Sequence, residues 1–253
     1  AGLRNLTSAE MVAAVEKHLN KAGMEADLLY APVIDGVVIP EAPLAALVKG
    51  NASGITLMTG TNFDEFRYWI QYSRFLEYIP LKMMLSLSPQ AEKKIRGHEE
   101  KVFDFYNRKF PNADMGDNTF SFITDAMFFI PHIQAAEAQS RHARVFMYRF
   151  DWKSQAKKYL GACHVLELLF VLKTFDSPKS HYIVGPDPPM RLSEIMQDAW
   201  VAFAKRGDPN ITGLPTWSPY DEQSRTTMIF DRDNRIENDP EKDVRLFYKG
   251  ILY

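Results

Sequence analysis

The most hydrophobic strand-like run of the chain lies near its middle, at residues 144–152. In this stretch, RVFMYRFDW, aromatic and aliphatic side chains occupy most positions. Such a run is typical of a β-strand that is buried on at least one face. A polar loop follows, and His164 then precedes the apolar stretch 165–172. The pattern predicts a central strand whose exit loop carries a histidine, a position where catalytic side chains are often found.

Shorter apolar runs predict the neighbouring strands. Residues 55–59 form one run, which Gly60 closes, and the acidic pair Asp64 and Glu65 follows. Residues 227–230 form another, and residues 235–237 are expected to pair with it. The turn signal Asp35-Gly36 within residues 30–43 predicts one more short strand and a loop.

Helical patterns fill most of the remaining chain. Thr7 and Glu10 have capping-box spacing at the start of an amphipathic helix that is expected to end before Gly23. Helices are also predicted within 66–141, at 193–205 and at 241–248. The expected breaks within 66–141 are Pro80, Pro111 and Pro131. Strands that alternate with long helices predict an α/β fold with a mainly parallel sheet.

Composition and charge exclude several classes of protein. The 253 residues are 46% hydrophobic and 25% charged, which is ordinary for a folded globular protein. A net charge of -2 gives no electrostatic reason to expect a nucleic-acid partner, and no apolar run is long enough to span a membrane. The single cysteine, Cys163, excludes an internal disulfide and favours the cytoplasm, with secretion as the alternative.

Two residues at strand exits are candidates for chemistry. Glu65 and His164 each follow a predicted strand, and the carboxyl ends of parallel strands share one edge of a sheet. A carboxylate bonded to an imidazole fixes its tautomer and stabilises its protonated form during proton transfer. Spacing alone favours the alternative, that both are unrelated polar residues on loops.

Other pairings near His164 are less convincing. Consecutive residues on an extended loop point apart, so Cys163 is expected to be small buried filling rather than a partner of His164. His164 and Glu167 have metal-ligand spacing, but no third ligand follows at a useful distance. No metal and no cofactor are therefore predicted.

Two motifs of the chain, Gly60-Thr61-Asn62-Phe63-Asp64-Glu65 and the run from His164 to Val171, resemble those of a known family. They are similar to the acid motif and the histidine motif of the type-B carboxylesterases, the cholinesterase-like branch of the α/β-hydrolases. Residues 34–36, 124–131, 200–210 and 214–217 match further family segments in the same order. The bacterial para-nitrobenzyl esterase-like members show the strongest resemblance, which covers essentially the whole chain.

The resemblance implies a fold, a reaction and roles for residues. It implies hydrolysis of a small apolar carboxylic ester on an α/β-hydrolase fold, with Glu65 as the triad acid, His164 as the base and Glu167 as a supporting buried carboxylate. Only the resemblance selects Glu65 over Asp64. Phe66, Tyr68 and Trp69 are candidates for lining a pocket near the acid, with packing of the following helix as the alternative, and Ile123 and Met127 are further pocket candidates from the helix before Pro131. Leu169 and Leu172 replace the proline and phenylalanine common in the family, which affects packing near the substrate.

The expected nucleophile has no candidate in the chain. In α/β-hydrolases the nucleophilic serine lies in a G-x-S-x-G motif ahead of the acid, yet the serines before Glu65 are Ser8 and Ser53, and neither has this context. Residues 1–253 are thus expected to be the C-terminal part of one α/β-hydrolase domain. The expected partner is the N-terminal half or a second copy of the chain. The alternative function is a non-catalytic cholinesterase-like interaction domain, which retention of both Glu65 and His164 disfavours.

Overall fold

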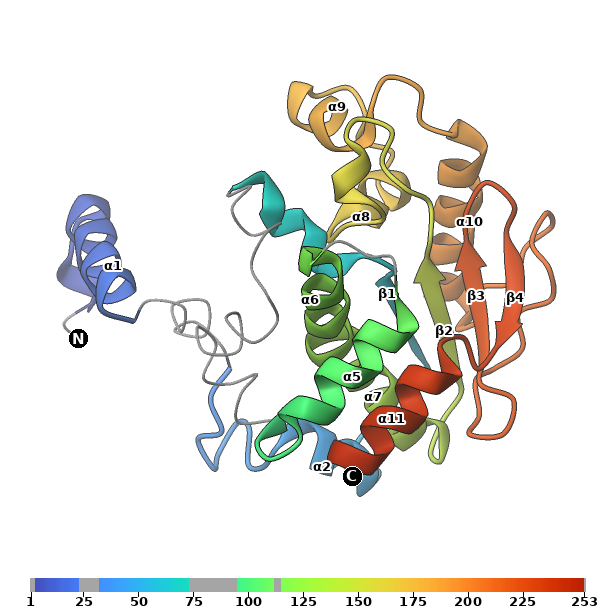
Figure 1. Ribbon diagram of the computed structural model, residues 1–253, viewed down its shortest axis with the longest axis horizontal. Coiled ribbons are helices and arrows are strands. Elements are labelled where there is room, and N and C mark those ends of the chain that lie inside the picture. The colour runs from blue at the N-terminus through green and yellow to red at the C-terminus, as the bar shows by residue number, and fades with distance from the viewer. Residues whose placement is uncertain (1–2, 23–31, 73–94, 112–114, 253) are drawn as a thin grey trace.

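A four-stranded sheet forms the centre of the molecule in a computed structural model that describes residues 3–22, 32–72, 95–111 and 115–252. The strands are β1 (Leu57–Asn62), β2 (Val145–Phe150), β3 (Thr226–Phe230) and β4 (Arg235–Asn238), in that order. The pairs β1–β2 and β2–β3 are parallel and β3–β4 is antiparallel (Figure 1). The predicted mainly parallel sheet and the predicted pairing of its last two strands are confirmed.

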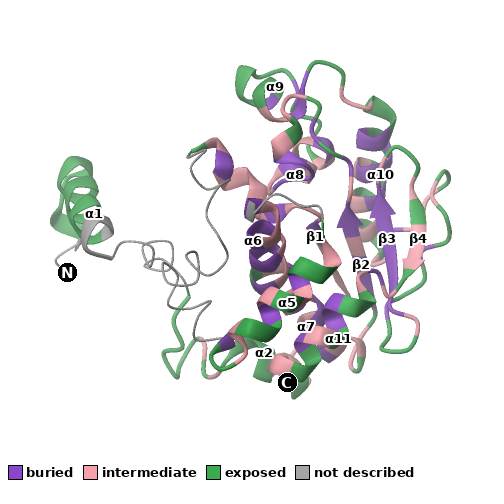
Figure 2. Ribbon diagram, viewed as in Figure 1, coloured by how far each residue is buried: buried purple, intermediate pink, exposed green. Residues whose placement is uncertain are grey.

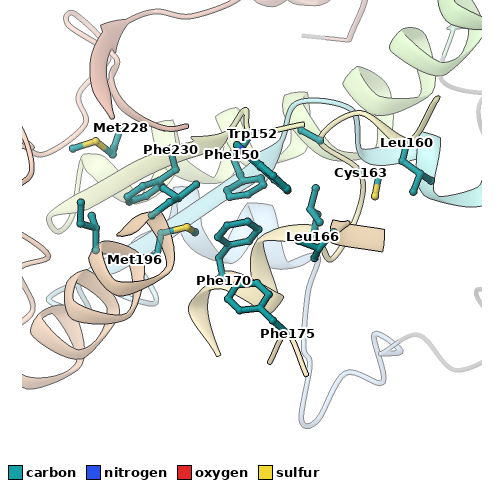
Figure 3. Close-up of a cluster of buried hydrophobic side chains, with 14 of the residues drawn as sticks. Phe150, Trp152, Leu160, Cys163, Leu166, Phe170, Phe175, Met196, Met228 and Phe230 are labelled. Carbon is teal, nitrogen blue, oxygen red and sulfur yellow. The ribbon is translucent and has the colours of Figure 1, made fainter. Parts of the chain in front are cut away.

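Helices cover both faces of this sheet because β2 alternates its side chains between them. Val145 and Met147 pack into one buried cluster, and Phe146 and Phe150 pack into the other. The first cluster receives α5 (Glu99–Lys109), α6 (Met115–Thr124), α7 (Ile130–Ser140) and α11 (Lys242–Leu252). The second receives α8 (Leu166–Val171), α9 (Pro178–Val184) and α10 (Met190–Arg206), and Figure 3 shows its aromatic and sulfur side chains. The middle strands β2 and β3 are almost entirely buried between these layers, whereas β4 at one edge has no buried residue (Figure 2).

The remaining elements complete the described part. They are η1 (Leu3–Asn5), α1 (Ser8–Ala22), α2 (Pro43–Val48), the 3₁₀ helices η3 (Glu65–Gln71) and η6 (Lys158–Leu160), and the π-helical segment η5 (Asp125–Phe129). The capping box predicted for α1 is confirmed. The Thr7 backbone N–H donates to the Glu10 carboxylate at 2.8 Å, and the Glu10 N–H donates to the Thr7 hydroxyl at 3.3 Å.

The predicted strand near Asp35 and the predicted break at Pro131 are both wrong. No strand forms within 32–43, because one Asp35 oxygen accepts the backbone N–H groups of the three residues that follow Gly36 at 2.8–3.0 Å and closes a turn. Pro131 does not break the helix either. It lies in the first turn of α7 directly after η5, where the Ile130 N–H bonds back five residues to the Asp125 carbonyl, so the helical path continues. Pro80 lies outside the described residues.

Gly60 lies inside β1 rather than at its end, which corrects the predicted strand 55–59. A Cβ atom built on Gly60 would lie 2.3 Å from the Tyr148 carbonyl oxygen and 2.5 Å from its ring. Glycine is needed here because the neighbouring strand leaves no room for a side chain, not because the chain turns. The strand therefore runs through to Asn62, directly before the acidic pair.

We expect Gly60→Ala to destabilise the chain by about 1–3 kcal/mol, because Tyr148 and β2 must shift to accept the methyl group. Gly250→Ala is the control. Gly250 lies in α11 with open space around its Cβ position, so alanine there should be neutral or stabilising by up to about 1 kcal/mol. Thermal and urea unfolding measure both, and equal stability of the two variants would contradict the packing at Gly60.

A buried acid links three helices on one side of the sheet. The Tyr106 hydroxyl donates to Asp125 Oδ2 at 2.6 Å, and the Tyr106 and Tyr248 hydroxyls are 3.2 Å apart. Burial raises the pKa of Asp125 to about 7, and the hydrogen bond from Tyr106 opposes this only in part. Glu241 also raises this pKa, whereas Lys109 lowers it. Asp125 is thus protonated in the folded chain at pH values where an unfolded chain would have ionised it.

This proton should make stability depend on pH. Between about pH 4 and pH 7 the folded state keeps a proton at Asp125 that the unfolded state releases, so the free energy of unfolding falls as pH rises, by at most roughly 1.4 kcal/mol per unit. Asp125→Asn should remove this part of the slope. Urea unfolding at several pH values measures it, with the exposed Asp104→Asn as control. A variant slope equal to that of the parent would refute the buried proton.

Candidate active site

The acid and the histidine meet at the carboxyl ends of β1 and β2. Glu65 is the first residue of η3, directly after β1, and is 6% exposed. His164 is carried by the loop between β2 and α8. The His164 Nδ1 atom lies 2.6 Å from Glu65 Oε2, and the His164 backbone N–H donates to the Glu65 carbonyl oxygen at 3.2 Å. The predicted contact between these two side chains is confirmed.

The electrostatics of the pair favour a charged imidazole. The hydrogen bond to Glu65 raises the pKa of His164, and partial burial of the ring opposes this without cancelling it. The second Glu65 oxygen accepts the Asn62 backbone N–H at 2.8 Å, so both carboxylate oxygens are held. Within the described part of the chain, His164 Nε2 has no hydrogen-bond partner, and its side chain is 37% exposed. Nδ1 is therefore anchored while Nε2 is free to meet another group.

Glu167 lies next to this pair through Asn62. The Asn62 side-chain amide donates to the Cys163 carbonyl at 2.7 Å and also to the Glu167 carboxylate. Burial raises the pKa of Glu167, and the bond from Asn62 opposes the shift. The sequence placed Asn62 in a motif but did not single it out. Cys163 is fully buried and burial raises its thiol pKa to about 12, as expected for inert filling.

The residue after His164 has a strained backbone. Val165 adopts the left-handed region with φ of 62°, which is a genuine outlier for a β-branched residue. Such conformations cost about 1–3 kcal/mol and persist where surrounding contacts enforce them. The strain therefore marks the histidine loop as a segment held in place by its neighbours.

Aromatic rings surround the imidazole. The Trp69 ring is stacked on His164 with centroids 5.2 Å apart, Phe128 lies at 5.4 Å and Tyr68 at 6.1 Å. Phe128 belongs to η5 and was missed as an individual residue, although the matching segment 124–131 contained it. Three aromatic rings thus lie against the imidazole.

The remaining pocket candidates have different positions. Met127 in η5 is 53% exposed, whereas Ile123 is buried in the cluster that contains Phe129. Phe66 stacks on Trp69 with centroids 5.2 Å apart. The contact of these three residues with a substrate stays a prediction.

A small cavity lies behind the acid loop. It has a volume of about 40 Å³ and is lined by Thr61, Asp64, Arg67, Asp125 and Arg149 among others, but not by Glu65 or His164. This volume holds one or a few waters, whereas pockets for small organic ligands are about 300–1,000 Å³. The cavity does not supply the place where an ester would lie against Nε2.

The described residues contain no group of three or more His, Cys, Asp or Glu side chains arranged to hold a metal ion. No helix in the same described ranges is both long and apolar enough to cross a membrane.

Comparisons with known proteins agree with these motifs. A model of the Carboxylesterase family matches residues 1–247. The chain is 36% identical to the para-nitrobenzyl esterase of Bacillus subtilis over 220 residues, which are 86% of this chain and 42% of that protein. It is 28% identical to the human cocaine esterase, covering 78% of this chain and 37% of that protein. The chain thus spans less than half the length of these curated relatives.

Solved structures give the same family. A PNB esterase matches 99% of this chain and 49% of its own with a TM-score of 0.80 at 29% identity. The carboxylesterase EST55 of Geobacillus stearothermophilus matches 94% of this chain and 55% of its own with a TM-score of 0.75 at 28% identity. The sheet and its helices are part of an α/β-hydrolase fold. From the motifs, the family model and these structures, the chain belongs to the carboxylesterase family.

Proposed function

We propose that this chain is the C-terminal part of a serine carboxylic ester hydrolase and that Glu65 and His164 are the acid and base of its triad. The observation that carries the proposal is the 2.6 Å contact between Glu65 Oε2 and His164 Nδ1, which leaves Nε2 without a hydrogen-bond partner among the described residues. The nucleophilic serine belongs to an N-terminal part that this chain does not contain. The matched lengths of the relatives, 42% and 37%, support a longer whole enzyme.

The geometry supports general base catalysis. In the proposed enzyme His164 Nε2 takes the proton of the serine hydroxyl as that oxygen attacks the ester carbonyl, and the imidazolium then donates the proton to the leaving alcohol. Glu65 keeps the Nδ1 proton in place and stabilises the imidazolium. The hydrogen bond between Glu65 and His164 is the largest cause of the raised pKa of His164. Water then attacks the acyl-enzyme in the same way. Nε2 takes a proton from the water, and the imidazolium returns it to the serine oxygen as the acid product leaves. No cofactor takes part in the proposed reaction.

The substrate is proposed to be a small apolar ester. The rings of Trp69, Phe128 and Tyr68 line the approach to His164, and aromatic faces favour apolar groups. Glu167 is proposed to steady Asn62 and thus the acid loop. The non-catalytic interaction domain is the less favoured function, since it would not need a bonded Glu65–His164 pair.

The partner is proposed to be the N-terminal part of the same enzyme. In the described sheet β1 pairs with β2 only, so its other edge is open to a further strand. Val33, Val37, Val38 and Ile55 are exposed ahead of β1, with Val37 at 83%. Exposed strand edges and apolar side chains favour association, and self-association of the chain is the alternative. The cytoplasmic location stays a prediction.

We expect the purified chain not to hydrolyse a chromogenic ester faster than free imidazole, because it has the acid and base without the nucleophile. Addition of the N-terminal part of the same gene product should restore turnover. Turnover by the chain alone that His164→Ala abolishes would contradict the assignment of the serine to another segment.

In the complete enzyme, His164→Ala and Glu65→Gln should each lower kcat by up to roughly 10⁴-fold, and the double variant should be little worse. Because Glu65 raises the pKa of His164, kcat/KM of the parent should rise with pH through a value above the ordinary 6.5, and Glu65→Gln should move this rise to lower pH.

Rate measurements from pH 5 to 9 test the roles of Glu65 and His164. The control is Glu194→Gln on the exposed face of α10, which should change neither kcat nor the pH profile. Activity within about tenfold of the parent for Glu65→Gln, together with its loss in Asp64→Asn, would make Asp64 the acid instead.

A further inference from the structure

The second acid of the acidic pair has a distinct set of contacts. Asp64 lies beside Glu65, yet its carboxylate does not touch His164. Asp64 Oδ2 accepts the Ala162 backbone N–H at 3.0 Å, and Asp64 Oδ1 accepts from Arg67 Nε at 3.1 Å. The Asp64 backbone N–H donates to the Ala162 carbonyl at 3.0 Å. One residue of the acid loop thus satisfies both backbone groups of a buried residue two positions before His164.

We propose that Asp64 is a positioning residue for the dyad: its carboxylate, oriented by Arg67, holds residues 161–162 of the histidine loop and so keeps the His164 ring on Glu65. This inference rests on the proposed function. The four residues Asp64, Arg67, Gly161 and Ala162 are called the loop clamp below.

Gly161 shows how closely the clamp fits. Its φ of 56° lies in the region that favours glycine, and a Cβ atom there would lie 2.3 Å from Asp64 Oδ2. The carboxylate therefore occupies the place that a side chain of the loop would take. The two segments can approach this closely because the residue at the contact is a glycine, which has no side chain and accepts a positive φ.

Arg67 fixes the direction of the Asp64 carboxylate and adds a further tie to the loop. Besides Asp64, its guanidinium donates to the Tyr159 carbonyl at 3.4 Å and to Asp117 at 2.5 Å. The Arg67 and Asp64 side chains are 20% and 14% exposed, so this ion pair is largely shielded from solvent. Tyr159 and Ala162 of the histidine loop are thereby hydrogen-bonded by Arg67 and Asp64, and Gly161 lies against the Asp64 carboxylate.

The clamp matters because the loop beyond it is strained. Val165, three residues after Ala162, has φ of 62°, and a β-branched residue relaxes from this region unless its neighbours prevent it. The contacts that fix His164 include its ring and backbone bonds to Glu65, the Ala162 bonds to Asp64 and the bond from the Asn62 side chain to the Cys163 carbonyl. If Asp64 releases Ala162, relaxation at Val165 moves the imidazole away from Glu65, and small misplacements of catalytic groups are costly.

The test uses Asp64→Ala and Asp64→Asn in the full chain, with NMR titration of His164 and detection of its Nδ1 proton. Asparagine keeps an oxygen that can accept the Ala162 N–H but loses the negative charge that pairs with Arg67. Asp64→Asn is therefore the conservative variant. Asp187→Asn, an exposed acid, is the matched control. Glu65→Gln serves as the reference for a lost dyad.

We expect Asp64→Ala to lower the His164 pKa toward its ordinary value and to weaken the Nδ1 proton signal, with Asp64→Asn in between and Asp187→Asn unchanged. In the complete enzyme, Asp64→Ala should lower kcat about tenfold or more with KM within about twofold, and Asp64→Asn should recover part of the loss. A purely structural role would lower the melting temperature without these changes.

An unchanged His164 pKa and Nδ1 signal in folded Asp64→Ala would overturn the clamp, and if that variant does not fold, the same result in Asp64→Asn would do so. Glu65→Gln, the reference variant, separates a failure of the clamp from a failure of the proposed function. If Glu65→Gln also leaves the His164 pKa and signal unchanged, the dyad itself is refuted.

Discussion

The parallel register of β1 on β2 is the constraint on which the candidate site depends. Asn62 pairs with Phe150, so the two strands end at the same height and their exit loops begin side by side. The Phe63 N–H continues the ladder by donating to the Phe150 carbonyl at 2.9 Å. A shift by one residue would turn the side chains of β1 to the opposite face. Gly60, which lets β1 pass against Tyr148, helps to fix this pairing close to the site.

Opposed electrostatic effects then act on two ionisable groups near the strand ends, His164 and Asp125. Burial and a hydrogen bond act against each other on His164, where the bond to Glu65 is the larger effect, and on Asp125, where burial is larger. The difference follows from the partners, since Glu65 is a carboxylate that favours a cation and Tyr106 is a neutral hydroxyl donor. An imidazole beside a carboxylate is thus held toward its charged form, whereas a buried carboxyl group beside a hydroxyl retains its proton.

The sequence predicted the sheet, most described helices and the Glu65–His164 contact, because strand patterns and exit motifs are local and β1 and β2 both lie in this chain. It failed where the deciding atoms are distant in sequence. Gly60 was taken as a strand end because the approach of Tyr148 is invisible from the local pattern. Pro131 was taken as a break because the π-helical bond between Ile130 and Asp125 has no clear sequence signal.

Asp64 shows the same limit within the candidate site. As one of two adjacent acids it was separable from Glu65 only by resemblance, and what distinguishes them is a partner 98 positions away, the Ala162 N–H. Adjacent residues leaving an extended strand point in different directions, so one carboxylate reaches the imidazole and the other reaches the backbone of the loop that carries it. In the proposed enzyme, acid, base and the contacts that hold the histidine loop all lie within one segment. The docking of the other segment then has to bring the serine oxygen to His164 Nε2.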